Sequence, residues 1–287
     1  MAPYKISLPL ALNQEYVHHL IGHIRAQNHI IRIIFDWSAC TKADNMALCI
    51  FMNLLYELEE KEISFEHLAQ ASNQYYTEQI NPFLTFPAKT LNLLESDFGA
   101  FLAAVDDEDE TVSRTMAMNE YLRSKNALKG LDITSLETLF SELFMNICQH
   151  SWAKNGIAFV SFPSNSSIIE IIISDIGVGI PSNIREEFSE YQERTDAEAI
   201  RYATQDWITT RSTDRNQGRG LNHTKTILST LNGKGHIYSG YGALTFDKNT
   251  ELALETDFHH GTQIHLLIDF SNFEKAIEPD YTEEVDF

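Results

Sequence analysis

The chain has 287 residues, 43% of them hydrophobic, which is enough apolar material for the cores of two domains. With 21 basic and 41 acidic residues, the formal net charge is −20, which argues against a general affinity for nucleic acid or an anionic membrane. The three cysteines have no metal-site spacing and imply no disulfide framework: Cys40, Cys49 and Cys148.

These cysteines suit a reducing compartment, and the sequence has neither a signal-peptide core nor an apolar run of roughly eighteen residues that could span a membrane. We therefore expect a cytoplasmic protein. Eleven histidines invite a metal hypothesis, but the pairs His19 with His23 and His259 with His260 have no third ligand at a familiar spacing. There is also no GxxxxGK[ST] phosphate loop.

The first hundred residues predict an α/β unit. A strand is expected at 6–10, a helix at 15–27, and a buried strand at 30–35 that ends in Asp36. A long helical pattern then runs from about 45 to 60. Strand, acid-bearing turn and helix in this order are typical of an α/β domain.

This segment is similar to a STAS domain, the family of anti-sigma factor antagonists, in which a strand ending in Asp is followed by an Asp-Ser pair that opens a helix. The resemblance places Asp36 on the first Asp and Asp44 on the second, and Asn45 then stands at the phosphorylatable Ser. It implies a docking or scaffold domain over residues 1–105 that lacks the usual phosphoryl switch. An unrelated small α/β domain is the alternative.

Five consecutive acids at 106–110 repel one another and indicate a solvated linker, which we take as the domain boundary. The Pro-bearing stretch 80–95 before it is expected to form loop and short elements that close the first domain. A helical pattern at 111–129 follows the acids, so 106–130 is predicted to be an acidic linker with a connecting helix. Residues 273–287 form an acidic tail that we expect to be mobile.

The most informative stretch is a predicted helix from Glu142 to His150. Glu142, Asn146 and His150 recur at intervals of four on one polar stripe, opposite an apolar side. Residues one turn apart can act on a common ligand. A carboxamide oxygen suits Mg²⁺ and a carboxylate can take a proton from a nucleophile. A solvated helix face is the alternative for this stripe taken alone.

Two glycine-bearing turns follow. The strand-like run 168–174 leads into Asp175, Gly177 and Gly179, where the backbone can come close to a flat ligand and the carboxylate can accept from an exocyclic amine such as adenine N6. The segment 217–221 opens an apolar helical run, and free amides at a helix N-terminus favour phosphate. Basic residues surround this second turn: Arg211, Arg215, Arg219 and Lys225.

Four patterns therefore occur in order: ExxxN, DxGxGI, GxGL, and Gly261-Thr262 before a strand at 263–268. Over roughly residues 131–272 the chain resembles the GHKL (Bergerat) ATPase family of gyrase, Hsp90, histidine kinases and mismatch-repair ATPases. The resemblance implies an α+β sandwich that binds ATP and Mg²⁺. It places Mg²⁺ on Asn146 and gives Glu142 the catalytic role of orienting or deprotonating a nucleophile.

The same resemblance implies the nucleotide contacts. Asp175 would receive the adenine amine, and Thr262 would close the pocket beside it. The residues assigned to nucleotide binding are Asn146, His150, Asp175, Gly177, Gly179, Ile180, Arg215, Gly218, Arg219, Gly220, Leu221 and Thr262. His150 ends its motif as in anti-sigma factor kinases, although a helix-terminal His favoured by the dipole is the alternative.

The third motif departs from the family pattern at one position. Asn222 stands where the family commonly has Gly, and this predicts altered phosphate contact.

A long charged stretch, 182–218, separates the second and third motifs and carries two short helical patterns. The resemblance implies that it is the family's ATP lid, with 209–213 as its hinge.

Two functions remain open. In the first, the protein transfers phosphate to a protein Ser or Thr, as anti-sigma factor serine kinases do, or slowly hydrolyses ATP. In the second, it is a nucleotide-gated interaction module with little or no catalysis. Either function implies a protein partner, as a regulator or a substrate, and leaves a homodimer open.

Overall fold

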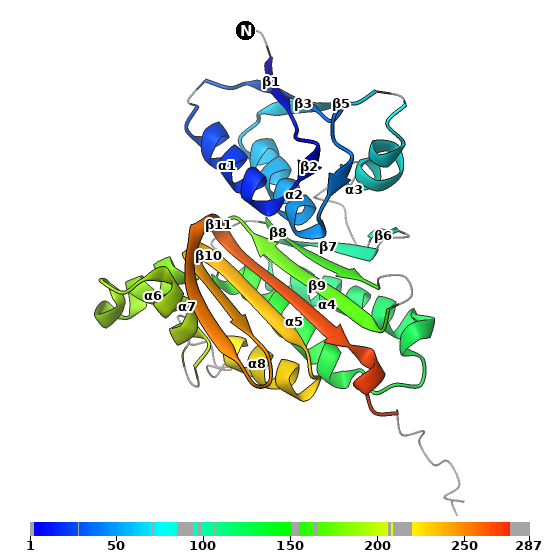
Figure 1. Ribbon diagram of the computed structural model, residues 1–287, viewed down its shortest axis with the longest axis vertical. Helices are drawn as coiled ribbons and strands as arrows, with labels where there is room; N and C mark the ends of the chain where they lie inside the picture. The colour runs from blue at the N-terminus through cyan, green and yellow to red at the C-terminus, as the bar shows by residue number, and fades with distance from the viewer. Residues whose placement is uncertain are drawn as a thin grey trace, which may run out of the picture.

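The computed structural model describes residues 3–27, 29–70, 72–84, 94–96, 99–105, 107–150, 155–162, 166–205, 208 and 220–275. A smaller N-terminal α/β unit is followed by a C-terminal unit built on a six-stranded sheet (Figure 1). The mixed α/β fold class predicted from the sequence is confirmed. Within the described part of the chain, no helix is long and apolar enough to cross a membrane.

The N-terminal unit contains a parallel three-stranded sheet in the order β1–β3–β5 and a short parallel pair, β2 with β4. Its strands are β1 (Tyr4–Ser7), β2 (Ala11–Leu12), β3 (Arg32–Asp36), β4 (Lys42–Ala43) and β5 (Ser64–Leu68). Its helices are α1 (Gln14–Arg25), α2 (Asn45–Glu60), the π-helix η1 (Tyr76–Ile80) and α3 (Asn81–Leu84).

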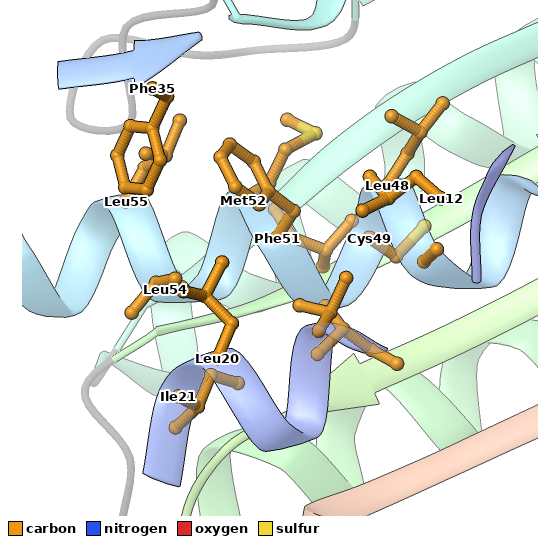
Figure 2. Packing of buried hydrophobic residues seen from close by; sticks show 14 of the residues in the cluster. Leu12, Leu20, Ile21, Phe35, Leu48, Cys49, Phe51, Met52, Leu54 and Leu55 are labelled. Atoms are coloured by element: carbon orange, nitrogen blue, oxygen red, sulfur yellow. The ribbon is translucent and has the colours of Figure 1, made fainter. Parts of the chain in front are cut away.

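Helix α2 occupies the centre of this unit and is buried almost all round, as expected for a helix with no polar face. It begins where predicted because Asp44 caps it. The Asp44 side chain accepts a hydrogen bond from the Ala47 amide, and this bond satisfies an otherwise unpaired N–H of the first turn. Phe51 meets Phe35 of β3 edge to face, with 4.9 Å between ring centroids. Leu20 and Ile21 of α1 pack against the opposite side of α2 (Figure 2).

The large sheet is antiparallel throughout, in the order β10–β11–β9–β8–β7–β6. Its strands are β6 (Leu94–Ser96), β7 (Gly99–Val105), β8 (Asn155–Ser161), β9 (Ile168–Asp175), β10 (Lys234–Phe246) and β11 (Glu251–Asp269). Ile171 and Ile173 of β9 join one core while Ile172 joins the core of the N-terminal unit. Because alternate residues face opposite sides, this double burial explains why β9 carries isoleucines on both of its faces.

Helices cover both faces of this sheet. Those of the C-terminal unit are α4 (Glu108–Ser124), η2 (Asn126–Leu128), α5 (Thr134–His150), α6 (Ile180–Glu187), η3 (Ser189–Tyr191), α7 (Asp196–Ala203), α8 (Gly220–Thr230) and η4 (Phe270–Asn272). Helices α4 and α5 pack on one face with α8 beside them, whereas α1 and α2 of the N-terminal unit lie against the other (Figure 1). The two units thus share the sheet as a common layer.

The domain boundary predicted at residue 105 does not follow the sheet. Strand β7 pairs with β8 from Ala100 opposite Val160 to Val105 opposite Asn155, and β6 pairs with β7, so both strands belong to the C-terminal unit. The described acidic residues, 107–110, are not a linker: Asp107 caps α4, where its side chain accepts a hydrogen bond from the Glu110 amide at 2.8 Å, and 108–110 form the first turn. The helix dipole favours acids in a first turn, which offsets their mutual repulsion.

Polar contacts fix the two units to each other. The Asn45 amide donates to Glu170 Oε2 of β9 at 2.7 Å, and the Asn53 amide donates to the Ser174 carbonyl at 2.9 Å. Asn45, which the STAS resemblance places at the phosphorylation position, therefore faces the large sheet. The strand, acid-bearing turn and helix of this unit are as predicted, and its STAS relationship stays a prediction.

Candidate functional site

Helix α5 presents its polar stripe beside the large sheet. Leu143, Phe144 and Ile147 are buried against the strands, while Glu142 and Asn146 are only half-buried. Helical spacing alone produces this division, because the apolar residues recur on one side of α5 and the polar ones on the other. His150 is the last residue of α5, and its side chain lies outside the described part of the structure.

Glu142 contacts His223, a residue that was not among the predicted site residues. Its Oε1 lies 2.5 Å from Nδ1 of His223, in the first turn of α8. Its Oε2 is buried and has no hydrogen-bond partner among the described residues. The sequence signal that could have pointed to His223 is its place two residues after the third motif. Oε1 of Glu142 is thus occupied by His223, whereas Oε2 can still accept a hydrogen bond.

Asp175 ends β9 as a buried carboxyl, 5% exposed. Its Oδ1 accepts from the Gly177 amide at 2.8 Å. Burial raises the pKa of Asp175 to about 7, while the hydrogen bonds from the Gly177 and Thr262 amides act in the opposite direction. The structure therefore brings Asp175, Gly177 and Thr262 together, and it leaves Asp175 titrating near neutral pH.

The turn after Asp175 lies flat against the bend of β11. Gly261 has a φ of +68°, and a Cβ there would stand 2.3 Å from the Asp175 carbonyl oxygen. Gly179, with a φ of +81°, would place a Cβ 2.6 Å from Ser239 Oγ. That hydroxyl accepts from the Ile180 amide and donates to the Gly261 carbonyl. Glycine is thus required on both sides of this contact.

A third glycine joins the first two motifs. Gly156 of β8 is the cross-strand partner of Asp175, and a Cβ on Gly156 would stand 2.5 Å from Ile147 Cγ2. The last turns of α5 therefore rest on β8 directly beside Asp175. Since Asn146 precedes Ile147, the first and second motifs meet at this point.

The third motif joins them from α8. Leu221 and Ile180 pack on a small cluster formed by Ile184, Ala199 and Ala203, and both also contact the main core. Gly220 is the first residue of α8. Lys225, expected among the positive charges of this turn, instead forms an ion pair with Glu251 and so is turned toward β11.

The segment expected to be a lid is described only in its first part. Helices α6 and α7 are present within it, and α7 packs on β10, where the Tyr241 amide donates to Asp196 Oδ2 at 2.7 Å. Gly242 allows this approach, because a Cβ there would stand 2.5 Å from the Ala197 amide nitrogen. The hinge 209–213 lies outside the described residues, together with Arg211, Arg215, Gly218 and Arg219.

No protein-family model and no curated protein matches the chain. Among solved structures, it is weakly similar to the histidine kinase domain of the blue-light activated histidine kinase from Erythrobacter litoralis EL346. The two are 11% identical, with a TM-score of 0.29, over 90% of this chain and 94% of that chain. A likeness at this TM-score supports no functional argument.

Proposed function

We propose that the C-terminal unit binds Mg-ATP in the manner of the GHKL family. The observation that carries the proposal is the buried Asp175 carboxyl at the end of β9, fixed by the Gly177 amide and backed by the glycine-rich contact with Gly261. A carboxylate acceptor held in a fixed direction suits recognition of the adenine amine. Gly179, Ile180 and Thr262 would line the base.

The phosphates would extend from this point toward α5 and α8. Gly220 and Leu221 begin α8, whose N-terminal amides favour anions, and the proposal extends to Arg215, Gly218 and Arg219 before it and to His150 on α5. Asn146 would hold Mg²⁺, and the site fits the ion because Asn146 lies one helical turn from Glu142, whose Oε2 has no hydrogen-bond partner among the residues that the structure describes. Bound Mg²⁺ would neutralise phosphate charge.

The reaction we favour is phosphoryl transfer to a Ser or Thr of a partner protein, or slow hydrolysis. Glu142 would take the proton from the attacking hydroxyl or water while the new O–P bond forms and the γ-phosphate leaves ADP. The free Oε2 of Glu142 is the oxygen suited to that role, since Oε1 contacts His223.

A second function is supported by the same contact. If His223 keeps Glu142 from acting as a base, the chain is a nucleotide-gated interaction module with little catalysis. The N-terminal unit would then serve as the docking element, as the STAS resemblance implies. This alternative differs from the first in turnover but not in nucleotide binding.

Calorimetric titration with Mg-ATP tests the proposed binding. The wild-type chain should bind, and Asp175→Asn should bind much more weakly because an amide presents a donor where the adenine amine requires an acceptor. Undiminished affinity in Asp175→Asn would refute the pocket. ATP labelled at the γ-phosphate then separates the functions: label on a protein indicates a kinase, free phosphate an ATPase, and neither an interaction module.

A further inference from the structure

One face of α1 rests on the bend of β11, directly behind the Asp175 turn. His18, Gly22 and Arg25 share this face because they are four and three residues apart. The His260 amide donates to His18 Nδ1 at 3.1 Å. Gly22 has no side chain to hold the two segments apart, and a Cβ there would stand 3.5 Å from His260 Nε2. The N-terminal unit therefore touches the proposed adenine pocket from outside.

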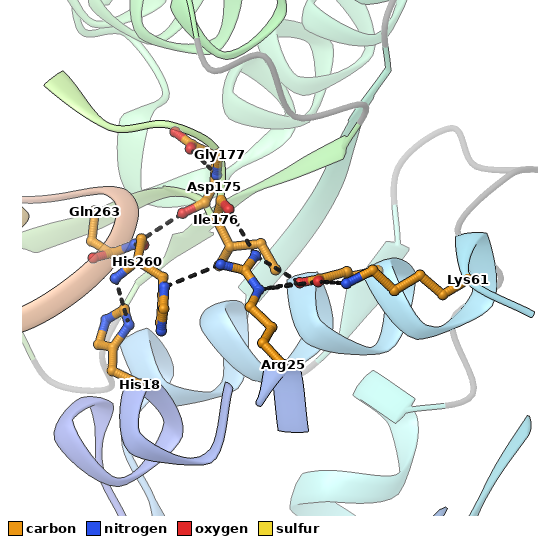
Figure 3. A network of polar contacts seen from close by, with 9 residues as sticks. His18, Arg25, Lys61, Asp175, Ile176, Gly177, His260 and Gln263 are labelled. Carbon is orange, nitrogen blue, oxygen red and sulfur yellow. Dashed lines mark hydrogen bonds and ion pairs between the residues drawn. The ribbon is translucent and has the colours of Figure 1, made fainter. Parts of the chain in front are cut away.

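Arg25 makes the decisive contact. Its guanidinium is fixed within the N-terminal unit by Glu57 of α2, with Nε 3.0 Å from Oε1 and Nη2 2.7 Å from Oε2. The remaining N–H groups reach the other unit, where Nη1 contacts His260 Nδ1 and Nη2 donates to the Ile176 carbonyl, both at 3.1 Å (Figure 3). The planar fork of Arg can hold three partners in this way, and a Lys ammonium cannot reproduce that geometry.

The Ile176 carbonyl belongs to the same peptide group as the Gly177 amide. That amide is the donor that fixes Asp175 Oδ1 at 2.8 Å. A peptide group is planar, so holding its carbonyl on one side sets the direction of its N–H on the other. Gln263 holds the preceding peptide similarly, by donating to the Asp175 carbonyl at 2.9 Å and to the His260 carbonyl at 2.7 Å (Figure 3).

We propose that Arg25 is a positioning residue for the nucleotide site: through the Ile176–Gly177 peptide it orients the Asp175 carboxylate, so the N-terminal unit sets nucleotide affinity within the same chain. This inference rests on the proposed function, because it names what Arg25 positions. It assigns the N-terminal unit a role that holds whether the chain is a kinase, an ATPase or an interaction module.

The test compares Arg25→Gln with Arg32→Gln in the full-length chain. Arg32 is a matched control, because it is an Arg of the same unit whose ion pair with Glu66 is exposed and contacts no residue of the Asp175 turn. Mg-ATP affinity should fall about tenfold in Arg25→Gln and stay unchanged in Arg32→Gln. Arg25→Lys, which keeps the charge but not the fork, should fall between them and serves if Arg25→Gln does not fold.

Two further readouts separate positioning from a general loss of stability. The pH midpoint of Mg-ATP affinity should rise in Arg25→Gln but not in Arg32→Gln, because a misdirected Gly177 amide no longer favours the ionised Asp175. Amide hydrogen exchange at Gly177 should also become faster in Arg25→Gln alone. Unchanged affinity and an unchanged midpoint in Arg25→Gln would overturn the inference.

Failure of the proposed function would look different. A wild-type chain that binds no Mg-ATP refutes nucleotide binding and, with it, the role of Arg25 in affinity. Hydrogen exchange at Gly177 would then still decide whether Arg25 holds the turn. A wild-type chain that binds Mg-ATP, with Arg25→Gln equal to it, refutes the inference and leaves the proposed function standing.

Discussion

Nδ1 of His223 lies 2.5 Å from Oε1 of Glu142, so the first turn of α8 is tied to the polar stripe of α5. The two residues are 81 positions apart: Glu142 belongs to the first motif, and His223 lies two residues after the third. A base that shares a hydrogen bond with a neighbour acts as part of a unit.

Glu142→Gln keeps the size of the side chain and removes the base. Mg-ATP affinity should be nearly unchanged, and turnover should fall by roughly a hundredfold or more because general-base catalysis contributes about that much. Labelled ATP measures the rate. Glu137→Gln on the same helix is the control, since its carboxylate pairs with Arg123 away from Glu142. Full activity in Glu142→Gln would remove this residue from the mechanism.

His223→Ala should lower turnover about tenfold with little change in affinity, since His223 orients the base and does not contact the adenine pocket. The double variant with Glu142→Gln should be no slower than Glu142→Gln alone, because residues that act as a unit are not additive. A double-mutant cycle of turnover checks this. Additive losses would mean that the two residues act independently, and faster turnover in His223→Ala would favour the gated module.

Mg-ATP affinity should depend on pH through Asp175. Its pKa is raised to about 7 by burial, and the adenine amine requires the ionised form. Affinity should therefore be lost as pH falls through about 7 and reach a plateau above 8. Calorimetry between pH 6 and 8 tests this, with Asp175→Asn as a reference that cannot ionise. A flat wild-type profile over this range contradicts the assignment.

Gly261→Ala should destabilise the fold more than Gly130→Ala. Both glycines have positive φ, +68° and +77°, but only Gly261 has backbone within 4 Å of a new Cβ. Gly130→Ala isolates the cost of the left-handed backbone, about 1–2 kcal/mol, and Gly261→Ala adds a clash of roughly 1–3 kcal/mol. Urea unfolding measures both. Equal losses would show that the close approach to the Asp175 turn contributes nothing.

Acid should loosen the contact between α1 and β11. Burial lowers the pKa of His18 to about 2 and those of His259 and His260 to about 4, all below the ordinary value of 6.5. The unfolded chain therefore binds protons first, so their contribution is intact above about pH 6.5 and is lost as pH falls toward 4. His18→Asn, which keeps an acceptor for the His260 amide, should flatten this slope in urea unfolding measured from pH 7.5 to 4.5. An unaltered slope would exclude His18.

The sequence predicted correctly those helix and strand ends that are set by residues close by in the chain. Helix α2 starts at Asn45 because Asp44 caps it, and β9 ends at Asp175 because glycines follow. The acidic residues at the start of α4 were wrongly predicted to form a linker. That prediction considered their mutual repulsion but not the favourable interaction of acids with the N-terminal end of a helix dipole. Five like charges indicate solvent exposure, and exposure is compatible with the first turn of a helix.

Contacts between segments that lie far apart in the chain could not be predicted from short sequence patterns. The residues of β7 were placed in the wrong unit because only their pairing with β8 reveals their sheet, and that pairing joins residues 50 (Val105 with Asn155) to 60 (Ala100 with Val160) positions apart. His223 and Arg25 escaped notice for the same reason. Neither has a motif of its own, and each acquires a role only when the fold brings it to Glu142 or to Ile176.

The Ile176–Gly177 peptide would couple Arg25 and the nucleotide site in both directions. A coupling free energy between two sites is reciprocal. If the Arg25 contact strengthens nucleotide binding, bound nucleotide must strengthen the contact between α1 and β11 by the same free energy. Emptying the pocket would then weaken the hold of the sheet on the N-terminal unit. The occupancy of the pocket would then set how firmly α1 is held against β11, at the buried contact between the two units.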